Sequence, residues 1–508
     1  MSAFRRTLPE RPNVEQQRKL AKELLDDFRR NDPEAIARLR AELPDKPAIT
    51  LADAQFVLAR EYGFRSWKAL TSHIEEGEHR IDPVEHFRRL VHDGNAAQLR
   101  EALKRDSRIR ALVDEPVFGF DSPALVAVGD APDVVDVLLE FGADPNRKSS
   151  WWAGGFHPLY GATPAVAERL LAGGAIPDAC AAASLDRPDL LRRILIDDPS
   201  RVHERGGDGQ TPLHFARSRT VADMLIDAGA DLDARDVDHR STAAEWMVSD
   251  RADLARYLVS RGSTPDIFLA AALGLTDRVR DMLTANPALL ELRTAQGEYA
   301  ERPPSSYHIY QWTLGPSLTP MQAAAKFGHR DTIAAMQAFA SPVQQLLLAC
   351  HEGRAGDAHA IVKENPGIVE RLQGADRRAL TDEAWTANAP AVALMMELGF
   401  DPAAPAVTGP TGGTALHCAA WEGSAACVSA ILAYPRGHAL IEAHDPVYNG
   451  TPLSWCAHGS RNSSKPYANY VEVARLLVAA GAKPTPEMLE HWNVVRDLFP
   501  DNEAGGRP

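Results

Sequence analysis

A four-residue segment of the form Thr-Pro-Leu-His recurs along this chain and constrains its fold more than any other feature. The imperfect copies are Thr211-Pro212-Leu213-His214, Thr319-Pro320-Met321-Gln322, Thr414-Ala415-Leu416-His417 and Thr451-Pro452-Leu453-Ser454. Threonine suits a helix N-cap, and the proline, where present, suits the first helical position. A second helical pattern follows each copy and often ends in a Gly-Ala turn, as at Gly229-Ala230. This self-similarity predicts a row of helix pairs that pack against their neighbours.

These residues resemble the ankyrin repeat, and the chain is similar to long bacterial ankyrin-repeat proteins. The likeness is specific at Thr211–Asp231 and Gly413–Gly423, and it extends over about four-fifths of the chain. It implies a protein-binding role through finger loops and the concave helical face, with no cofactor. It also implies that His214 and His417 tie a helix to the adjacent turn by hydrogen bonds. Gln210, His239 and Arg240 then fall at finger or turn positions open to a partner.

The predicted fold class is all-α, a solenoid of about twelve irregular helix-pair units of roughly 24–36 residues. Residues 1–80 are expected to form a helical N-terminal cap that covers the first repeat. Residues 81–486 form the array, and residues 487–508 a C-terminal cap and flexible tail. Within the cap, Asp32 and Pro33 predict a helix start. Trp67, Leu70 and Ile74 share one inward face by their helical spacing.

One extended aromatic insertion, at about 294–317, departs from the repeat. Its centre alternates Tyr307, Ile309 and Gln311 with His308, Tyr310 and Trp312. This alternation predicts a short strand or an extended hairpin arm. An array needs no such insert for stability, and aromatic side chains with a polar tip are favoured in contacts. We therefore expect ligand or partner contacts from Tyr307, His308, Tyr310 and Trp312. Packing over the edge of the array is the alternative.

A second aromatic feature, Trp151-Trp152, occupies the slot of a finger between two units. Two adjacent indoles cannot both face one side of an extended loop, so one should be exposed or cover a ligand. Both are candidate partner-binding residues. The alternative is that they stack finger on finger.

A third departure lies on the first helices of the last two units. Trp421 and Glu422 in one unit match Trp455 and His458 in the next, and neighbouring helices stack roughly 10 Å apart. The four residues are expected to form one patch. A carboxylate beside an imidazole is competent for general acid–base chemistry, but it is also an ordinary hydrogen-bonded pair.

Two functions follow from these features. The leading prediction is a protein-binding scaffold that uses the concave groove and the finger loops, and not an enzyme. The alternative is a small-molecule-binding protein or an atypical enzyme, in which residues 300–315 close over the groove as a lid. Glu422, His458 and His308 would then be the acid–base groups. The chain has no Walker loop, dinucleotide fingerprint, HExxH or GxSxG motif.

Charge and cysteine content indicate which classes of partner and which cellular compartment to expect. The 55 basic and 69 acidic residues give a net charge of −14, which disfavours a nucleic-acid partner. The five cysteines are odd in number and lack a CxxC pair, which predicts no disulfide framework, no zinc site and a reducing cytoplasm. No run approaches the ~18 apolar residues that span a bilayer, and no signal peptide is evident. We expect a cytosolic monomer without metal or membrane attachment.

Overall fold

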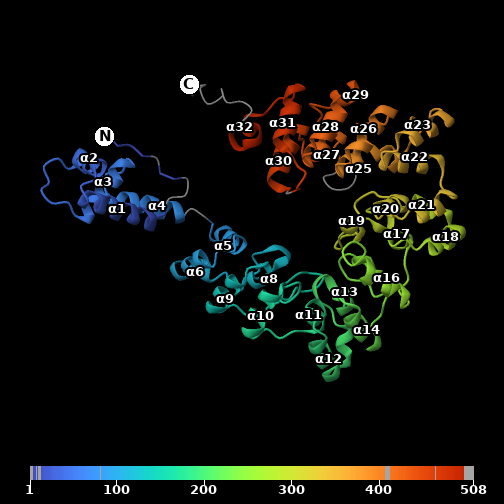
Figure 1. The fold of residues 1–508 in the computed structure, drawn as a ribbon, viewed down its shortest axis with the longest axis horizontal. Helices are drawn as coiled ribbons and strands as arrows, with labels where there is room; N and C mark the ends of the chain where they lie inside the picture. The colour runs from blue at the N-terminus through green and yellow to red at the C-terminus, as the bar shows by residue number, and fades with distance from the viewer. Residues whose placement is uncertain are drawn as a thin grey trace. The chain divides into compact units, whose positions relative to one another are not determined.

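The computed structural model describes residues 4–6, 8, 9, 13–79, 82–406, 412–463 and 465–496. The chain divides into two compact units, Met1–Arg147 with Glu168–Gly174, and Lys148–Ala167 with Ala175–Pro508. Helices and turns make up the described residues, and no strand is found among them (Figure 1). The all-α prediction is confirmed. Most of the predicted C-terminal tail, residues 497–508, lies outside the described residues.

The first unit begins with α1 (Val14–Arg29), α2 (Pro33–Glu42), α3 (Leu51–Glu61) and α4 (Trp67–His79). The predicted cap of α2 is confirmed, because Asp32 accepts a hydrogen bond from the Ala35 N–H at 2.9 Å and Pro33 follows it. Helix α3 packs against the other three helices. Leu70 and Ile74 are buried as predicted. The buried side chains of these helices therefore form two small apolar clusters.

The rest of the first unit follows the helix-pair pattern. Its helices are α5 (Pro83–His92), α6 (Ala96–Arg105), α7 (Ser107–Arg110), α8 (Ala124–Ala127) and α9 (Pro132–Glu140), with the short 3-10 turn η1 (Gly119–Asp121). Helix α5 packs on α6 and α8, and α9 packs on α6 and α8. Helix α10 (Pro164–Ala172) contributes residues to both units.

The second unit holds the remaining helices. In chain order they are α11 (Ala179–Ser184), α12 (Pro188–Asp197), η2 (Pro199–His203), η3 (Gly207–Gly209), α13 (Pro212–Phe215), α14 (Arg219–Asp227), α15 (Ala243–Trp246), α16 (Ala252–Ser260), α17 (Ile267–Ala272), α18 (Thr276–Ala285), η4 (Pro287–Glu291), η5 (Gly297–Tyr299), α19 (Tyr310–Thr313), α20 (Pro320–Lys326), α21 (Arg330–Gln337), α22 (Pro342–His351), α23 (Ala355–Glu364), α24 (Gly374–Arg377), α25 (Ala379–Trp385), α26 (Ala389–Leu398), α27 (Ala415–Trp421), α28 (Ala425–Leu432), α29 (Pro435–His438), α30 (Pro452–Asn462), α31 (Tyr470–Ala479), α32 (Pro486–His491) and α33 (Asn493–Arg496).

Neighbouring pairs in this unit stack first helix on first helix and second on second. Helix α13 packs against α11 and α15, while α14 packs against α12 and α16. The same order recurs near the C-terminus, where α27 packs against α25 and α30, and α28 against α26 and α31. The first helices are rich in alanine, as in α11 and α17, and small side chains permit this close stacking. Each pair thus buries its apolar face against its neighbours.

The recurring histidine has the structural role that the resemblance implies. His214 Nδ1 lies 2.9 Å from Thr211 Oγ1, and its Nε2 lies 3.0 Å from the Ser241 carbonyl oxygen in the next loop. His417 repeats this arrangement with Thr414 and the Gly450 carbonyl. A carbonyl oxygen only accepts, so each Nε2 carries the proton and donates it. Each imidazole therefore ties the start of one first helix to the loop before the next.

The insertion differs from its predicted form. Residues 294–317 contain η5, an isolated Arg302–Ser305 bridge and α19, and no strand. Ile309, Tyr310 and Leu314 enter the apolar core. Helical spacing places these three side chains on one side of the segment, whereas a strand would turn Ile309 and Tyr310 to opposite faces. Burial of adjacent apolar residues therefore overrides the alternation, and the predicted strand is wrong.

No helix in the parts of the chain that the structure describes has both the length and the apolar character needed to cross a bilayer.

Candidate functional site

Four loops between helix pairs in the second unit form what we call the finger row: residues 149–156, 205–210, 235–242 and 293–318. Each loop closes at its base through a backbone hydrogen bond of 2.9–3.0 Å. The pairs are Ser149 N to Phe156 O, Gly206 N to Gln210 O, Asp236 N to Ser241 O and Thr294 N to Leu318 O. The first three loops are short. The last is the predicted insertion, here called the long finger.

Glycine lets the first three fingers approach one another closely. A Cβ on Gly154 would lie 2.2 Å from the Gly206 carbonyl oxygen, and one on Gly209 would lie 2.3 Å from the Val237 side chain. Gly209 also has a φ of +71°, a conformation that glycine adopts without steric cost. The first finger therefore packs closely on the second and the second on the third, so these three loops form a supported surface.

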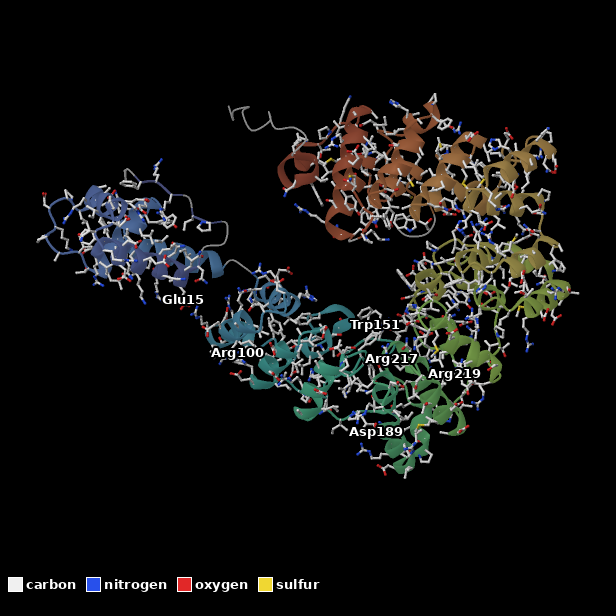
Figure 2. All side chains as sticks on the ribbon, in the orientation of Figure 1. Glu15, Arg100, Trp151, Asp189, Arg217 and Arg219 are labelled. Carbon is white, nitrogen blue, oxygen red and sulfur yellow. The ribbon has the colours of Figure 1, made fainter. Side chains whose placement is uncertain are left out.

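The two tryptophans of the first finger divide as the sequence suggests. Trp152 is 44% exposed, whereas Trp151 is half-buried. Their ring centroids lie 6.1 Å apart. Burial raises the pKa of the Asp208 carboxyl group in the second finger to about 6, and Trp151 interacts with that group and counters part of the rise. Trp151 (Figure 2) thus supports the contact between fingers, and Trp152 faces solvent.

The long finger docks on the third finger through four hydrogen bonds, one of them from the Ser305 hydroxyl to the Val237 carbonyl oxygen at 3.4 Å. The Ser306 N–H donates to Asp238 Oδ1 at 2.8 Å, and the Ile309 N–H donates to Ser241 Oγ at 3.1 Å. His239 Nδ1 lies 2.8 Å from the Tyr307 carbonyl oxygen. These contacts join residues 68 positions apart. They leave the Trp312 side chain 65% exposed and Tyr307 half-buried.

The other two predicted contact residues of the long finger are internal. Tyr310 is fully buried, and its hydroxyl donates to Asp266 at 2.8 Å. His308 is buried beside Glu245, with Nε2 and Oε2 3.4 Å apart. Burial raises the pKa of Asp266 to about 6. Burial of Glu245 acts to raise the pKa of its carboxyl group, but the hydrogen bond and charge of His308 help to lower that pKa below its usual value. His308 and Tyr310 therefore hold the long finger on the array, and their predicted contact with a partner is corrected to a packing role.

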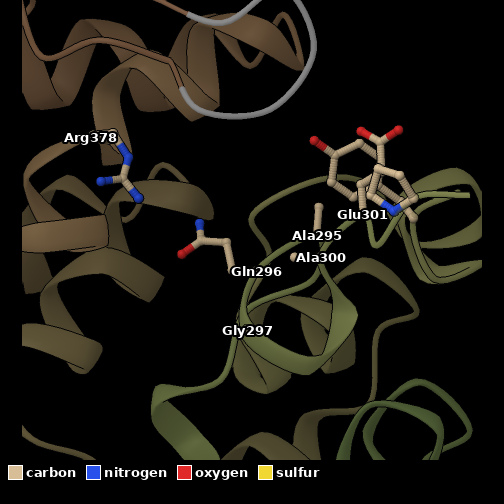
Figure 3. Close-up of a pocket in the computed structure, with 8 residues that line it drawn as sticks. Ala295, Gln296, Gly297, Ala300, Glu301 and Arg378 are labelled. Carbon is tan, nitrogen blue, oxygen red and sulfur yellow. The ribbon is translucent and has the colours of Figure 1, made fainter. Parts of the chain in front are cut away.

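A pocket of about 430 Å³ opens beside the long finger (Figure 3). Its lining residues are Ala295, Gln296, Gly297, Ala300, Glu301, Pro303, Tyr307 and Arg378. Figure 3 shows Arg378 on one side and Glu301 on the other. Within the described residues, the buried Arg378 Nε has no hydrogen-bond partner, although one Nη donates to the Gly374 carbonyl at 3.0 Å. The guanidinium therefore keeps a donor for an acidic group in the pocket.

Hydrogen bonds hold one lining residue of this pocket, Gln296, in place. Gln296 donates to Ser317 Oγ at 2.9 Å, and that hydroxyl donates to Asp382 at 2.6 Å. Burial raises the pKa of Asp382 to about 6, although Ser317 and the charges of Arg293 and Arg378 act to lower it. Sequence reasoning missed Arg378, because it lies one residue before α25, in a unit that shows no departure from the repeat.

The predicted patch near the C-terminus is only partly assembled. The rings of Trp421 and Trp455 lie 6.1 Å apart, and the buried Trp455 donates its indole N–H to Asp445 at 2.9 Å. His458 is exposed and its ring contacts Trp492, with ring centroids 4.5 Å apart and the ring planes tilted by 53°. The indole of Trp455 therefore braces the following loop, and His458 lies against the C-terminal segment.

Glu422 has other partners than the predicted imidazole. It is buried, and it accepts a hydrogen bond from the Tyr467 hydroxyl at 2.7 Å. It also forms an ion pair with the Lys465 ammonium group at 3.0 Å. The proposed acid–base trio of Glu422, His458 and His308 thus has three separate sets of neighbours. Because proton transfer requires groups within hydrogen-bond reach, the enzyme alternative is not favoured by this geometry.

Comparison with known proteins identifies one repeat. The family model for the ankyrin repeat matches residues 208–237, which contain α13, α14 and the Asp208 turn of the second finger. No curated protein matches the chain. Together with the stacked helix pairs, this match shows ankyrin-repeat character, and ankyrin repeats suggest a module for protein interaction.

Proposed function

We propose that this chain binds a protein partner through its finger row, with the long finger as the principal contact. The exposed Trp312 on an anchored loop is the observation that carries the proposal. Tyr310, two residues earlier, is fully buried and bonded to Asp266, so Trp312 faces solvent from a fixed base. An ordered, exposed indole binds at little cost in conformational entropy, and tryptophan is enriched among the residues that dominate interfaces.

Two further features of the row support a protein partner. Trp152 presents a second exposed indole on the first finger. The pocket beside Tyr307 offers the Arg378 guanidinium, which suits a carboxylate side chain of the partner. The concave face of the first helices is the second surface that we assign to the partner, with Trp421 as its half-buried aromatic residue.

We also propose a cytoplasmic location and a monomer. All five cysteines are free and buried, which suits a reducing compartment. The monomer follows from the ankyrin-repeat character alone, since stacked pairs cover each other's apolar faces.

The experiment that tests this function compares Trp312→Ala with a matched control. A partner is first captured with the wild-type chain, identified by mass spectrometry and purified, and its Kd is then measured for each variant. Ile196→Ala is the control, because Ile196 is 72% exposed on α12, outside the finger row. We expect Trp312→Ala to weaken binding at least tenfold, about 1.4 kcal/mol, and the control to leave it unchanged. An unchanged Kd for Trp312→Ala, or equal losses in both variants, would contradict the proposal.

A further inference from the structure

The second and third fingers bring three metal-ligating side chains together: Asp208, Asp238 and His239. One ligand atom from each lies within 4.8 Å of the other two. The loops that carry them are locked, because the N–H groups of Val237 and Asp238 both donate to the Asp208 carbonyl oxygen, at 2.8 and 3.1 Å. Asp208 and Asp238 are only 7% and 2% exposed. Two carboxyl groups and an imidazole thus meet in a buried position whose backbone is already fixed.

The hydrogen bond of His239 leaves one ring nitrogen for a ligand. Nδ1 lies 2.8 Å from the Tyr307 carbonyl oxygen, so it must carry a proton and donate it. In the neutral ring Nε2 then has a free lone pair, and it lies 3.8 Å from Asp238 Oδ2. Anchoring one imidazole nitrogen on a carbonyl group is the usual way in which proteins orient a metal-binding histidine.

Asp208 provides a second, independent indication. Its Oδ1 is buried and has no hydrogen bond of good geometry within the part of the chain that the structure describes, although the Trp151 indole interacts with this carboxyl group. A buried carboxylate oxygen without a well-formed hydrogen bond is costly. A cation between Asp208, Asp238 and His239 would remove that cost.

The neighbouring Asp236 is excluded from this set by its own hydrogen bonds. Its two oxygens accept from the N–H groups of Ser241 at 2.5 Å and His239 at 3.1 Å. Asp236 therefore stabilises the turn of the third finger, and the candidate metal ligands are the other three residues, Asp208, Asp238 and His239.

We propose that Asp208, Asp238 and His239 bind one divalent transition-metal cation that clamps the second finger to the third. One imidazole nitrogen and two carboxylate oxygens suit Zn²⁺ and its first-row neighbours. Bond lengths of about 2.0–2.2 Å to such a metal require the side chains to close slightly around it, and water completes the coordination. His239 also contacts the long finger through Tyr307, so the cation stiffens three consecutive fingers. This inference does not depend on what the finger row binds.

A second cluster of suitable residues, Asp178, Cys180 and Glu204, is a weaker candidate. Asp178 already accepts from the Lys148 ammonium and the Tyr160 hydroxyl, each at 2.7 Å. Burial raises the pKa of the Cys180 thiol well above its usual value, whereas metal binding requires the thiolate. Asp178 therefore already has hydrogen-bond partners, and Cys180 is held as a neutral thiol, so this cluster does not need a metal.

The test is titration of the metal-free, full-length chain with Zn²⁺, followed by calorimetry, and with Co²⁺, followed by its visible absorption. The variants are Asp208→Asn and His239→Gln. Asparagine has the shape of aspartate and tolerates the left-handed φ of 56° at position 208, so the fold should survive, as checked by circular dichroism. His359→Gln is the control, since His359 pairs with Glu397 at 3.0 Å on an exposed surface.

We expect one equivalent of Zn²⁺ to bind the wild-type chain and the control, and each ligand variant to bind at least about tenfold more weakly. Zn²⁺ should also raise the thermal unfolding midpoint of the wild-type chain and not that of the variants. The proposal is overturned if no stoichiometric binding occurs. It is equally overturned if Asp208→Asn and His239→Gln bind like the wild type, or if Cys180→Ser alone abolishes binding.

Discussion

At the scale of single residues, the histidine that ends two of the four recurring tetrapeptides is a hydrogen-bonding element of the fold that must stay neutral. His214 is wholly enclosed, and burial lowers its pKa to about 4 from a usual 6.5. Its Nε2–H spans from one helix pair to the loop before the next. The same buried ring cannot exchange protons readily near neutral pH, which argues for structure and against catalysis at this position.

This pKa makes a prediction about pH. The unfolded chain binds a proton at His214 below pH 6.5 and the folded chain only below about pH 4, so the unfolded state gains stability as the pH falls between these values. The contribution of the neutral ring is therefore full above pH 6.5 and is lost towards pH 4, with a maximum of about 3 kcal/mol. Amide hydrogen exchange across α13, corrected for intrinsic exchange rates, measures the local free energy of opening in the wild type and in His214→Gln. The opening free energy of the wild type minus that of His214→Gln should grow from pH 4.5 to pH 6.5 and then stay constant. A difference independent of pH would contradict the argument.

At the scale of elements, local signals predict helix starts well and predict the long finger poorly. Asp32, Thr319 and Thr451 cap helices as expected, because a cap depends on residues three positions away. The form of the long finger depends on contacts with residues 68 positions earlier. A short alternating pattern carries no information about such contacts, and here the burial of Ile309 and Tyr310 determines the structure.

Substitutions at Tyr310 and Trp312 in the long finger should have different effects on the free energy of unfolding, because only Tyr310 is buried. Tyr310→Ala removes a fully buried ring and the donor to Asp266, which should cost about 3–5 kcal/mol. Tyr310→Phe keeps the ring and removes one hydrogen bond to a buried acid, which should cost about 1.5–3 kcal/mol. Trp312→Ala, at an exposed position, should cost less than about 0.5 kcal/mol. Denaturant unfolding provides the comparison. Destabilisation by Trp312→Ala comparable to that by Tyr310→Ala would show that the indole packs and does not present a contact surface.

At the scale of the whole molecule, the repeat pattern in the sequence predicts the order of helix pairs and the contacts between stacked helices, but not the contacts that loop residues make. The adjacency of Trp421 and Trp455 follows from stacking of α27 on α30 and is therefore predictable. Glu422 was expected beside His458, yet its partners Tyr467 and Lys465 come from the loop after α30. Asp208 and His239 likewise meet across two fingers. Loop conformation determines these contacts, and a repeat pattern does not encode it.

Stacking in single file also predicts how the second unit opens. A pair inside the row must break two interfaces to expose its core, whereas a pair near the end breaks fewer. Cys350 on α22 and Cys456 on α30 form a matched pair of probes, since both are fully buried and burial raises the pKa of each to about 12. In urea below the unfolding midpoint, we expect iodoacetamide to label Cys456 at least about tenfold faster, a difference of about 1.4 kcal/mol in opening free energy. Mass spectrometry of the digested chain locates the label. Equal rates at the two thiols would mean that the second unit opens as one cooperative body, and the nearest-neighbour description of its stability would then be wrong.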